Sequence, residues 1–269
     1  MTQFPSLEES EFIKTRRRIQ SVAKVIGKYR EELVKPIAKN DNLYLKVVDK
    51  GFCTPAMPEY NELEIGCNLE TLKVEIANSK DYDSIDLPDK TQRELSDKLK
   101  SVLSKYAVNP EIDNSNFNSS KVFDVSEKDA TDFLTQFANY NELLAAFHKK
   151  INVGVKTQIC LWPHHFDNAF KWFSGKKINE EDEYMAIGVS NGDEMYELPY
   201  IYFTLYPPLR KTNTLEIPEG AFLHDTDWTG LILPYEVLME KKDTVSQTEL
   251  VSNFLDISFK SIQRGFTKR

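Results

Sequence analysis

The chain has 269 residues, of which 41% are hydrophobic and 28% are charged. A chain of this length buries roughly three quarters of its unfolded surface, so its stability requires neither disulfides nor a structural metal. The formal net charge of -8 disfavours anionic partners, because an acidic surface repels nucleic-acid phosphates and anionic lipids. We therefore expect a globular protein that binds neither nucleic acid nor a membrane.

The cysteine spacing and the lack of long apolar segments indicate in which cellular compartment the protein is expected. Cys53, Cys67 and Cys160 form no CxxC pair and lack metal-ligand spacing. The N-terminal residues are charged and lack the apolar segment of a signal peptide. No apolar run approaches the roughly 20 residues that a membrane-spanning helix requires. These features predict a cytoplasmic protein.

The first half of the chain predicts a helix, several strands and a second helix. A capping box formed by Ser6 and Glu9 precedes apolar residues at helical spacing, and Pro36 ends this helix. The capping box of Thr91 and Glu94 begins the second helix, which has one apolar side. Hydrophobic alternation predicts strands at 43–48, 63–65 and 72–76, and Gly51 with Pro55 and Pro58 predicts a loop.

The second half predicts the same order of elements. Ser126 caps a helix whose apolar positions continue to Ile151. A short helix with one aromatic face is expected at 166–173, and the capping box of Ser246 and Glu249 begins the last helix. Strands are predicted at 157–161, 184–189, 200–206 and 231–233, with an acidic surface loop at 179–183.

The order of the elements favours an α+β fold. Strands cluster without a helix between each pair, which predicts a largely antiparallel sheet with flanking helices. The stretch 109–125 begins with Asn, Asp and Ser around Pro110 and predicts a connecting loop. We therefore divide the chain into an N-terminal half, 1–108, and a C-terminal half, 126–269. Both halves have the order helix, strands, helix, which suggests two similar halves, although no residue-level repeat accompanies it.

Several common chemistries have no motif in this chain. It contains no GxGxxG, no phosphate-binding loop, no HExxH, no EF-hand spacing and no GxSxG. Nucleotide-dependent enzymes, common zinc peptidases and α/β-hydrolases are therefore disfavoured. All four histidines lie beyond residue 147, so any imidazole chemistry belongs to the C-terminal half.

The segment from Trp162 to Asp167 is the main candidate site. His164 and His165 follow a predicted strand and precede the expected short helix, and functional side chains are often placed at such element ends. Asp167 can orient an imidazole by accepting its ring N–H. We name His164, His165 and Asp167 as candidate catalytic residues, and Trp162 as a candidate ligand contact.

A second patch extends this candidate site. His224 lies close in sequence to Asp227 and Trp228, and we expect His224 to be catalytic and Trp228 to contact a ligand. If the two patches meet in space, His164, His224 and Asp227 form a ligand set for a divalent metal with an open position. Adjacent histidines face different directions, so only one of His164 and His165 is expected to share a site with His224.

Two other interpretations of these patches stay open. The Trp162 to Asp167 segment is also explained as a packed turn whose polar atoms bond to the backbone. A ligand pocket or catalytic pocket without a metal is the second explanation. We therefore predict no cofactor, with a divalent metal as the alternative.

The strand at 200–206 predicts another wall of a pocket. Tyr200, Tyr202 and Tyr206 fall on one face, where their phenolic groups are able to bind a polar ligand. The alternative is an amphipathic strand whose tyrosines cover neighbouring strands.

Four motifs occur in order along the chain: Gly51 to Pro58, Leu161 to Ala169, Tyr200 to Pro207 and His224 to Pro234. Together they resemble a bacterial family of uncharacterised proteins, domain of unknown function 5996, over nearly the whole chain. The resemblance implies relatives and no particular activity.

We expect a small-molecule-binding or structural module, because no complete catalytic constellation assembles from the sequence. The alternative is a metal-assisted hydrolase that uses a His/Asp site. A small molecule is the expected partner, and nothing in the sequence indicates an oligomeric state.

Overall fold

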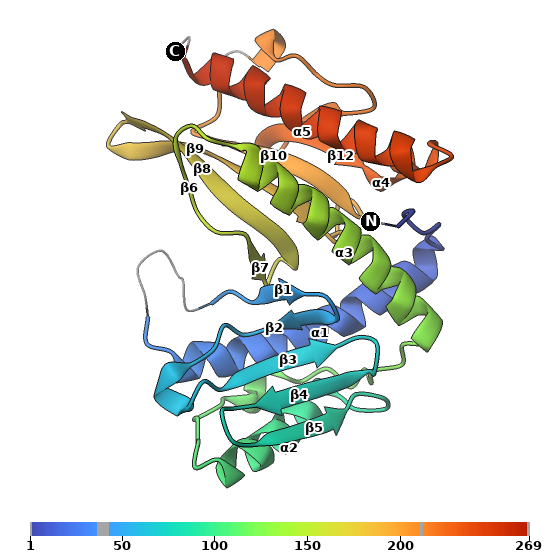
Figure 1. The fold of residues 1–269 in the computed structure, drawn as a ribbon, viewed down its shortest axis with the longest axis vertical. Helices are drawn as coiled ribbons and strands as arrows, with labels where there is room; N and C mark the ends of the chain where they lie inside the picture. Colours follow the sequence, from blue (N-terminus) through green and yellow to red (C-terminus); the bar gives the residue numbers. More distant parts are fainter. Residues whose placement is uncertain (1, 37–42, 210–211, 268–269) are drawn as a thin grey trace. The chain divides into compact units, whose positions relative to one another are not determined.

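The computed structural model describes residues 2–36, 43–209 and 212–267 of the chain. Within these residues, helices accompany two antiparallel sheets, which confirms the expected α+β fold (Figure 1). The chain divides into two compact units. The first unit comprises Met1–Ser6, Thr135–Ile159 and Asp167–Arg269, and the second comprises Leu7–Leu134 and Cys160–Phe166. The stretch 109–125, expected to connect two halves, lies within the second unit.

The second unit is built on an antiparallel sheet in the order β1-β2-β3-β4-β5. Its strands are β1 (Lys46–Val48), β2 (Gly51–Cys53), β3 (Glu64–Asn68), β4 (Lys73–Ala77) and β5 (Tyr82–Asp86). Helix α1 (Glu9–Leu33) packs against β3 and against α2 (Gln92–Lys105), which packs against β5. The expected hairpin is present, because β3 and β4 pair directly and both alternate between buried and half-buried residues. The short strand β7 (Cys160–Trp162) joins this unit through the pair Leu45 and Leu161.

The first unit contains a sheet in the order β11-β12-β10-β9-β8-β6. Its strands are β6 (Val155–Lys156), β8 (Asp167–Ile178), β9 (Glu181–Ser190), β10 (Tyr200–Tyr206), β11 (Phe222–Asp225) and β12 (Thr229–Pro234). Helices α4 (Tyr235–Met239) and α5 (Thr244–Thr267) belong to this unit. Helix α3 (Glu127–Lys150) begins in the second unit and continues into this one. Short 3₁₀ helices occur at η4 (Thr212–Thr214) in this unit, and at η2 (Pro58–Tyr60) and η3 (Asn114–Asn116) in the second unit.

The two faces of the sheet in the first unit differ in what covers them. Phe203 of β10 contacts the ring of Phe147 on α3 and the ring of Phe254 on α5, so these helices cover one face (Figure 1). Side chains alternate along a strand, so Tyr200, Tyr202 and Tyr206 point to the opposite face. We call this opposite face the tyrosine face.

The prediction of a short helix at 166–173 is wrong, because residues 167–173 form the first part of the long strand β8. The spacing of Phe166, Ala169, Phe170 and Phe173 fits a helix, but the same segment alternates in a way that suits a sheet. Phe170 and Trp172 are buried on the helix-covered face, and β8 pairs with β9 along nearly its whole length. Pairing with a distant strand overrides the local periodicity.

The helix termini confirm some expected caps and correct others. Thr91 and Glu94 form the predicted capping box of α2, and Ser126 accepts from the backbone N–H of Asp129 at the start of α3. The predictions of capping boxes beginning at Ser6 and at Ser246 are wrong. Helix α1 begins at Glu9 behind a Glu8 cap, and Asp243 accepts from the backbone N–H of Ser246 at the start of α5.

The acidic segment 179–183, expected as a surface loop, is a two-residue turn followed by the first three residues of β9. Asn179 and Glu180 have φ values of 53° and 71°, and β9 already begins at Glu181. Two consecutive left-handed residues are typical of a two-residue hairpin turn. The missed strands β2 and β11 have three and four residues, and β5 is largely polar with a single buried residue, Ile85, which explains their weak sequence signal.

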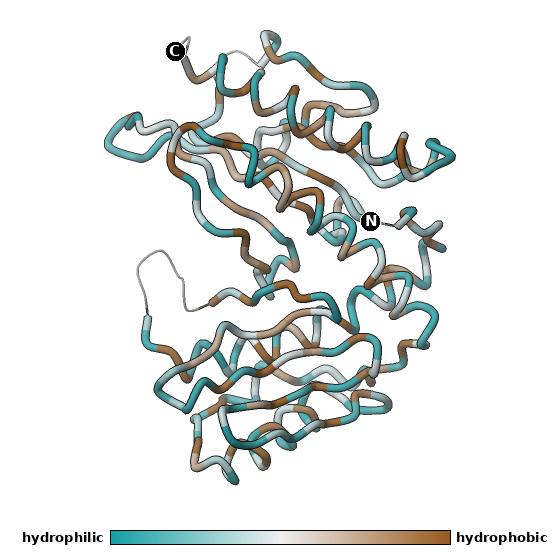
Figure 2. The backbone as a smooth tube through the Cα atoms, viewed as in Figure 1, coloured by the Kyte–Doolittle hydropathy of each residue, from teal (hydrophilic) through white to brown (hydrophobic). Residues whose placement is uncertain are grey.

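Hydrophobic and hydrophilic stretches alternate along the helices in the described part of the chain (Figure 2). Amphipathic helices of this kind bury one side and expose the other. None of the described helices combines the length and the apolar character needed to cross a membrane.

Candidate functional site

The candidate residues predicted from the sequence fall into both compact units. The second unit contains Trp162, His164 and His165. The first unit contains Asp167, Tyr200, Tyr202, Tyr206, His224, Asp227 and Trp228. The composite metal site of His164, His224 and Asp227 draws on both units and therefore stays a prediction.

The His-His segment forms a turn in the second unit. The backbone N–H of Phe166 donates to the carbonyl of Trp162 at 2.7 Å, and Phe166 has a φ of 60°. The side chain of Phe166 is buried against the rings of Phe52 and Phe133. His164 and His165 are exposed, and the backbone carbonyl of His164 accepts a bond of 2.9 Å from the Gln20 amide. The turn is thus anchored by Phe166, and both imidazoles face solvent.

His224 is the centre of a hydrogen-bonded cluster in the first unit. It lies on β11 with an exposed fraction of only 2%. Its Nδ1 lies 2.9 Å from the hydroxyl of Tyr196, and its Nε2 lies 2.8 Å from a carboxylate oxygen of Asp227. The hydroxyl of Thr226 is also within 3.0 Å of Nε2. Both ring nitrogens of this buried histidine therefore have partners, as burial requires.

The chemistry of these partners assigns the proton on the ring. An ionised carboxylate only accepts hydrogen bonds, so Nε2 of His224 carries the hydrogen and donates it to Asp227. In the neutral ring, Nδ1 is then the acceptor and receives the hydroxyl proton of Tyr196. The bond from His224 lowers the pKa of Asp227, which keeps this exposed carboxyl ionised at neutral pH. Asp227, His224 and Tyr196 thus form a directed chain of hydrogen bonds.

The phenol at the end of this chain is suited to binding. Burial raises the pKa of Tyr196, and the nearby carboxylates of Asp193 and Asp227 raise it further. The hydroxyl therefore remains protonated at neutral pH, and it is a poor nucleophile. Its hydrogen is donated to His224, so its oxygen presents lone pairs to an approaching ligand.

Trp228 covers His224 from one side. The two rings are stacked with centroids 4.1 Å apart, and the indole also meets the ring of Tyr202 edge-on at 6.2 Å. This approach requires glycine at position 230. A Cβ there would lie 1.8 Å from the Phe203 carbonyl oxygen and 2.5 Å from the Trp228 ring. The half-buried Trp228 thus forms an aromatic edge beside the hydrogen-bonded chain.

The tyrosines of β10 each donate to a carboxylate. The hydroxyl of Tyr200 donates to Asp193 at 2.6 Å, and the hydroxyl of Tyr202 donates to Asp167. Tyr200 and Tyr202 form a buried cluster with Ala169 and Ile232, against which Trp228 and Tyr196 pack. Burial raises the pKa of both phenols, and the paired carboxylates raise it further. These hydroxyls stay protonated and are committed to their partners.

Tyr206 lies at the other end of β10 and takes no part in this cluster. Its ring stacks on Tyr184 with centroids 5.1 Å apart, and its hydroxyl donates to Glu181. The structure thus brings Asp167, Tyr200, Tyr202, His224, Asp227 and Trp228 together on the tyrosine face and places Tyr206 apart.

Metal-ligand geometry is not evident in the described residues. In residues 2–36, 43–209 and 212–267, no group of three or more His, Cys, Asp or Glu side chains is arranged to hold a metal ion. His224 and Asp227 are adjacent, but both ring nitrogens of His224 already bond to Tyr196, Thr226 and Asp227.

Sequence reasoning missed Tyr196 and Asp193. They lie in the connection between β9 and β10, where Asp193 accepts from the backbone N–H groups of Met195 and Tyr196. The Asn-Gly-Asp sequence at 191–193 does signal a turn. Nothing local signals that Tyr196 reaches His224, which is 28 residues away.

Comparison with known proteins identifies the family. The family of unknown function DUF5996 matches residues 4–264. The chain belongs to the DUF5996 family. Comparisons with curated proteins and with solved structures found no match. The resemblance carried by the four motifs is thus confirmed, and the function of this DUF5996 protein has to be argued from its own residues.

Proposed function

We propose that this DUF5996 protein binds a small polar ligand at the exposed edge of the cluster on the tyrosine face. The observation that carries the proposal is the hydrogen-bonded chain from Asp227 through His224 to Tyr196. A buried histidine with both nitrogens engaged holds the phenol in one orientation. Such preorganised polar groups beside aromatic rings are typical of ligand sites.

The direction of the hydrogen bonds favours one class of ligand. Tyr196, Tyr200 and Tyr202 donate their hydroxyl hydrogens to partners within the protein. The accessible polar atoms of the cluster are therefore mainly acceptors, on Tyr196, Asp193 and Asp227. A complementary ligand supplies hydrogen-bond donors, as a small amine or a polyol does. Trp228 offers a ring against which the carbon atoms or the cation of such a ligand packs.

Two of the cysteines support the same compartment as the sequence. Cys53 and Cys67 are free thiols, and burial raises the pKa of both, that of Cys53 to about 11. Thiols that are neither paired nor ionised fit a reducing environment. We propose that the protein acts in the cytoplasm.

The proposal is tested by titrating the protein with ethanolamine, methyl glucoside and acetate. The readout is the indole N–H signal of Trp228 in a ¹⁵N-labelled sample. We expect ethanolamine or methyl glucoside to shift this signal with saturation, and acetate to leave it unchanged, because the carboxylates of Asp193 and Asp227 repel an anion. Binding of acetate alone, or no saturating shift with any probe, contradicts the proposal.

A matched pair of variants places the ligand. Tyr196→Phe removes the accepting oxygen. It is expected to weaken binding of ethanolamine at least roughly tenfold, as loss of a hydrogen bond to a charged group does. Tyr184→Phe is the control, since Tyr184 also lies half-buried on the tyrosine face but outside the cluster. Equal affinity of Tyr196→Phe and the wild type would place the ligand elsewhere.

A further inference from the structure

The N-terminal residues dock on the first unit as a separate arm. Residues 2–6 belong to this unit, whereas α1, the helix that follows them, belongs to the second unit. They form neither helix nor strand. Phe4 is nevertheless buried, with an exposed fraction of 2%, while Thr2, Gln3 and Ser6 are exposed. We call residues 2–6 the arm, and Phe4 is the residue by which it packs into the unit.

The site that receives Phe4 has an aromatic wall. The centroid of the Phe4 ring lies 4.7 Å from that of Tyr140 on α3 and 6.1 Å from that of Tyr235 on α4. The two tyrosine rings also meet each other edge-on at 6.2 Å, so helices of the unit itself hold this wall together. Tilted and edge-on contacts between rings stabilise a docked aromatic side chain beyond the area that it buries.

Two buried amides of the first unit hold the main chain of the arm. Asn139 on α3 binds Thr2 twice, because its Oδ1 accepts from the Thr2 N–H at 3.2 Å and its Nδ2 donates to the Thr2 carbonyl at 2.9 Å. Gln247 on α5 accepts from the Phe4 N–H at 3.1 Å. Both amide side chains are buried, with exposed fractions of 3% and 1%. Hydrogen bonds to the main chain of an extended segment, with a pocket for one side chain, are a common mode of peptide recognition.

These polar groups are oriented for the arm. A buried amide lowers stability unless it is hydrogen-bonded, so a core that requires only filling takes apolar side chains. Nε2 of Gln247 lies 3.5 Å from the carbonyls of Leu238 and Lys241, which turns its Oε1 toward the arm. The Tyr235 hydroxyl donates to the carbonyl of Pro5. We give the name arm slot to the four residues Asn139, Tyr140, Tyr235 and Gln247.

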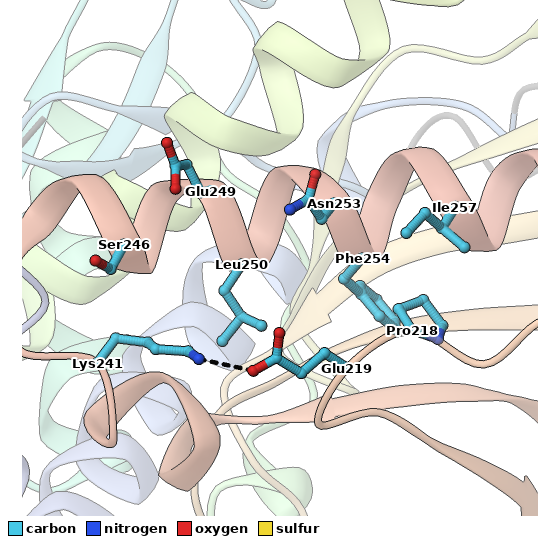
Figure 3. Close-up of a pocket in the computed structure, with 9 residues that line it drawn as sticks. All are labelled: Pro218, Glu219, Lys241, Ser246, Glu249, Leu250, Asn253, Phe254 and Ile257. Carbon is cyan, nitrogen blue, oxygen red and sulfur yellow. Dashed lines mark hydrogen bonds and ion pairs between the residues drawn. The ribbon is translucent and has the colours of Figure 1, made fainter.

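The arm slot is distinct from the hollow that lies along α5 (Figure 3). None of the four slot residues lines that hollow. Leu250 and Phe254 in its lining are buried, and Lys241 at its side pairs with Glu219. The hollow therefore offers little apolar surface to a ligand, whereas the arm slot already holds a buried ring.

We propose that the arm slot is a peptide-binding site. The arm is a ligand held in cis, and a partner protein displaces it with an extended segment that contains an aromatic residue followed by proline. Phe4 and Pro5 supply this pattern in the arm, and proline suits the second position because it has no N–H to satisfy. Release of the arm breaks no helix or strand. The proposal is independent of the ligand on the tyrosine face, because the slot residues lie on helices and that ligand site lies on the sheet.

The covalent link favours the arm of the same chain over the arm of a second copy. A ligand on a short linker has an effective concentration in the millimolar range, so a second copy competes only near millimolar protein. We therefore expect a monomer by light scattering at about 100 µM protein, well below that range. A dimer that disappears in Phe4→Ala would assign the slot to a second copy and overturn the proposed partner.

The test uses the full-length protein and a peptide with the sequence of residues 1–6, labelled with fluorescein at its C-terminus. In Phe4→Ala the chain's own arm no longer fills the slot, so this variant is expected to bind the peptide with saturation. The wild type is expected to bind it at least roughly tenfold more weakly, because its arm competes at an effective concentration in the millimolar range. Fluorescence anisotropy measures both affinities. The control is the same peptide with Phe4→Ala, which is expected not to bind.

Two further variants keep the test decisive if Phe4→Ala does not fold. Thr2→Pro removes the N–H that Asn139 accepts and leaves the packing of Phe4 unchanged, so it is expected to bind the peptide more tightly than the wild type does. Asn139→Leu, added to Thr2→Pro, is expected to weaken peptide binding roughly tenfold, as loss of two hydrogen bonds does. Lys149→Gln is the control for this addition, since Lys149 is exposed near the end of α3.

Three results overturn the peptide site. They are failure of a folded Phe4→Ala or Thr2→Pro protein to bind the peptide, equal binding of the two peptides, and equal affinity of the wild type and Phe4→Ala. The last result would mean that the arm and the peptide do not share a slot. Circular dichroism verifies the folding of each variant. Binding of ethanolamine or methyl glucoside at Trp228 bears only on the proposed function.

Discussion

Tyr202 and Tyr206 lie on the same face of β10, and each donates its hydroxyl to a carboxylate. Their surroundings differ, because Tyr202 is 8% exposed within a cluster of aromatic rings and Tyr206 is half-buried beside solvent. A hydrogen bond to a charged group is worth more when its loss leaves a buried charge without a partner. Two similar phenol–carboxylate hydrogen bonds from tyrosines of one strand thus contribute differently to stability.

We expect Tyr202→Phe to lower the free energy of unfolding by about 1.5–3 kcal/mol, the usual value of a buried hydrogen bond to a charged group. Tyr206→Phe is the matched control and is expected to change stability much less, because water replaces its hydroxyl at Glu181. Urea unfolding followed by circular dichroism measures both. Equal losses in the two variants would contradict the role assigned to burial.

Position 188 on β9, the strand next to β10, has room only for glycine. A Cβ at residue 188 would lie 2.6 Å from Cβ of Ala169 and 2.7 Å from the hydroxyl of Tyr202. Both neighbours face Gly188 across the paired strands. The sequence alone shows a glycine in a strand, which marks close approach without naming the partner.

At the scale of elements, helix α2 shows a local signal that the structure confirms. The Thr91 hydroxyl accepts from the backbone N–H of Glu94, and the Glu94 carboxylate accepts from the backbone N–H of Thr91. Both bonds connect residues three positions apart, so the motif acts without the rest of the fold. Strand β8 is the opposite case, because its pairing with β9 decides its structure.

We expect Thr91→Ala to lower the free energy of unfolding by about 1 kcal/mol, because the backbone N–H of Glu94 loses its acceptor. Ser101→Ala is the control, since Ser101 is exposed within the same helix and alanine is a better helix former. The bond from the Thr91 backbone lowers the pKa of Glu94, so its stabilising effect is present at neutral pH and is lost as the pH falls through that pKa. Chemical denaturation at pH 7 provides the measurement, and a loss in Ser101→Ala as large as in Thr91→Ala would contradict this assignment.

At the scale of the whole molecule, the distribution of charge decides which partners are excluded. The basic run at 14–18 is the strongest local exception to a net charge of -8. Lys14 and Arg18 both pair with Asp124, at 3.2 Å and 2.6 Å, and Arg16 is buried. These contacts reduce the positive field that this run offers to an approaching phosphate.

We therefore expect no binding to a fluorescein-labelled DNA duplex by anisotropy at 150 mM salt and about 10 µM protein, where nonspecific binders begin to saturate. Asp124→Asn is the sensitive control, because it releases two cations on the same surface and is the variant in which weak, salt-dependent binding would first appear. Saturable binding by the wild type would contradict the prediction.

The sequence by itself determined the α+β class, the long helices, the hairpin of β3 and β4, and the family. These features depend on periodicity, caps and ordered motifs, which act over a few residues or are read directly. It also named most members of the cluster on the tyrosine face, from Asp167 to Trp228.

Only the tertiary structure decided that β8 is a strand, that Tyr196 and Asp193 belong to the cluster, and that the imidazoles of His164 and His165 face solvent. Each of these outcomes depends on a contact between residues far apart in the chain, or on a side chain's exposure in the fold. A short sequence window encodes the preference of a backbone for helix or strand, but it does not encode which distant side chain completes a hydrogen bond. The Asp227, His224 and Tyr196 chain forms because antiparallel pairing brings β11 within reach of the connection before β10.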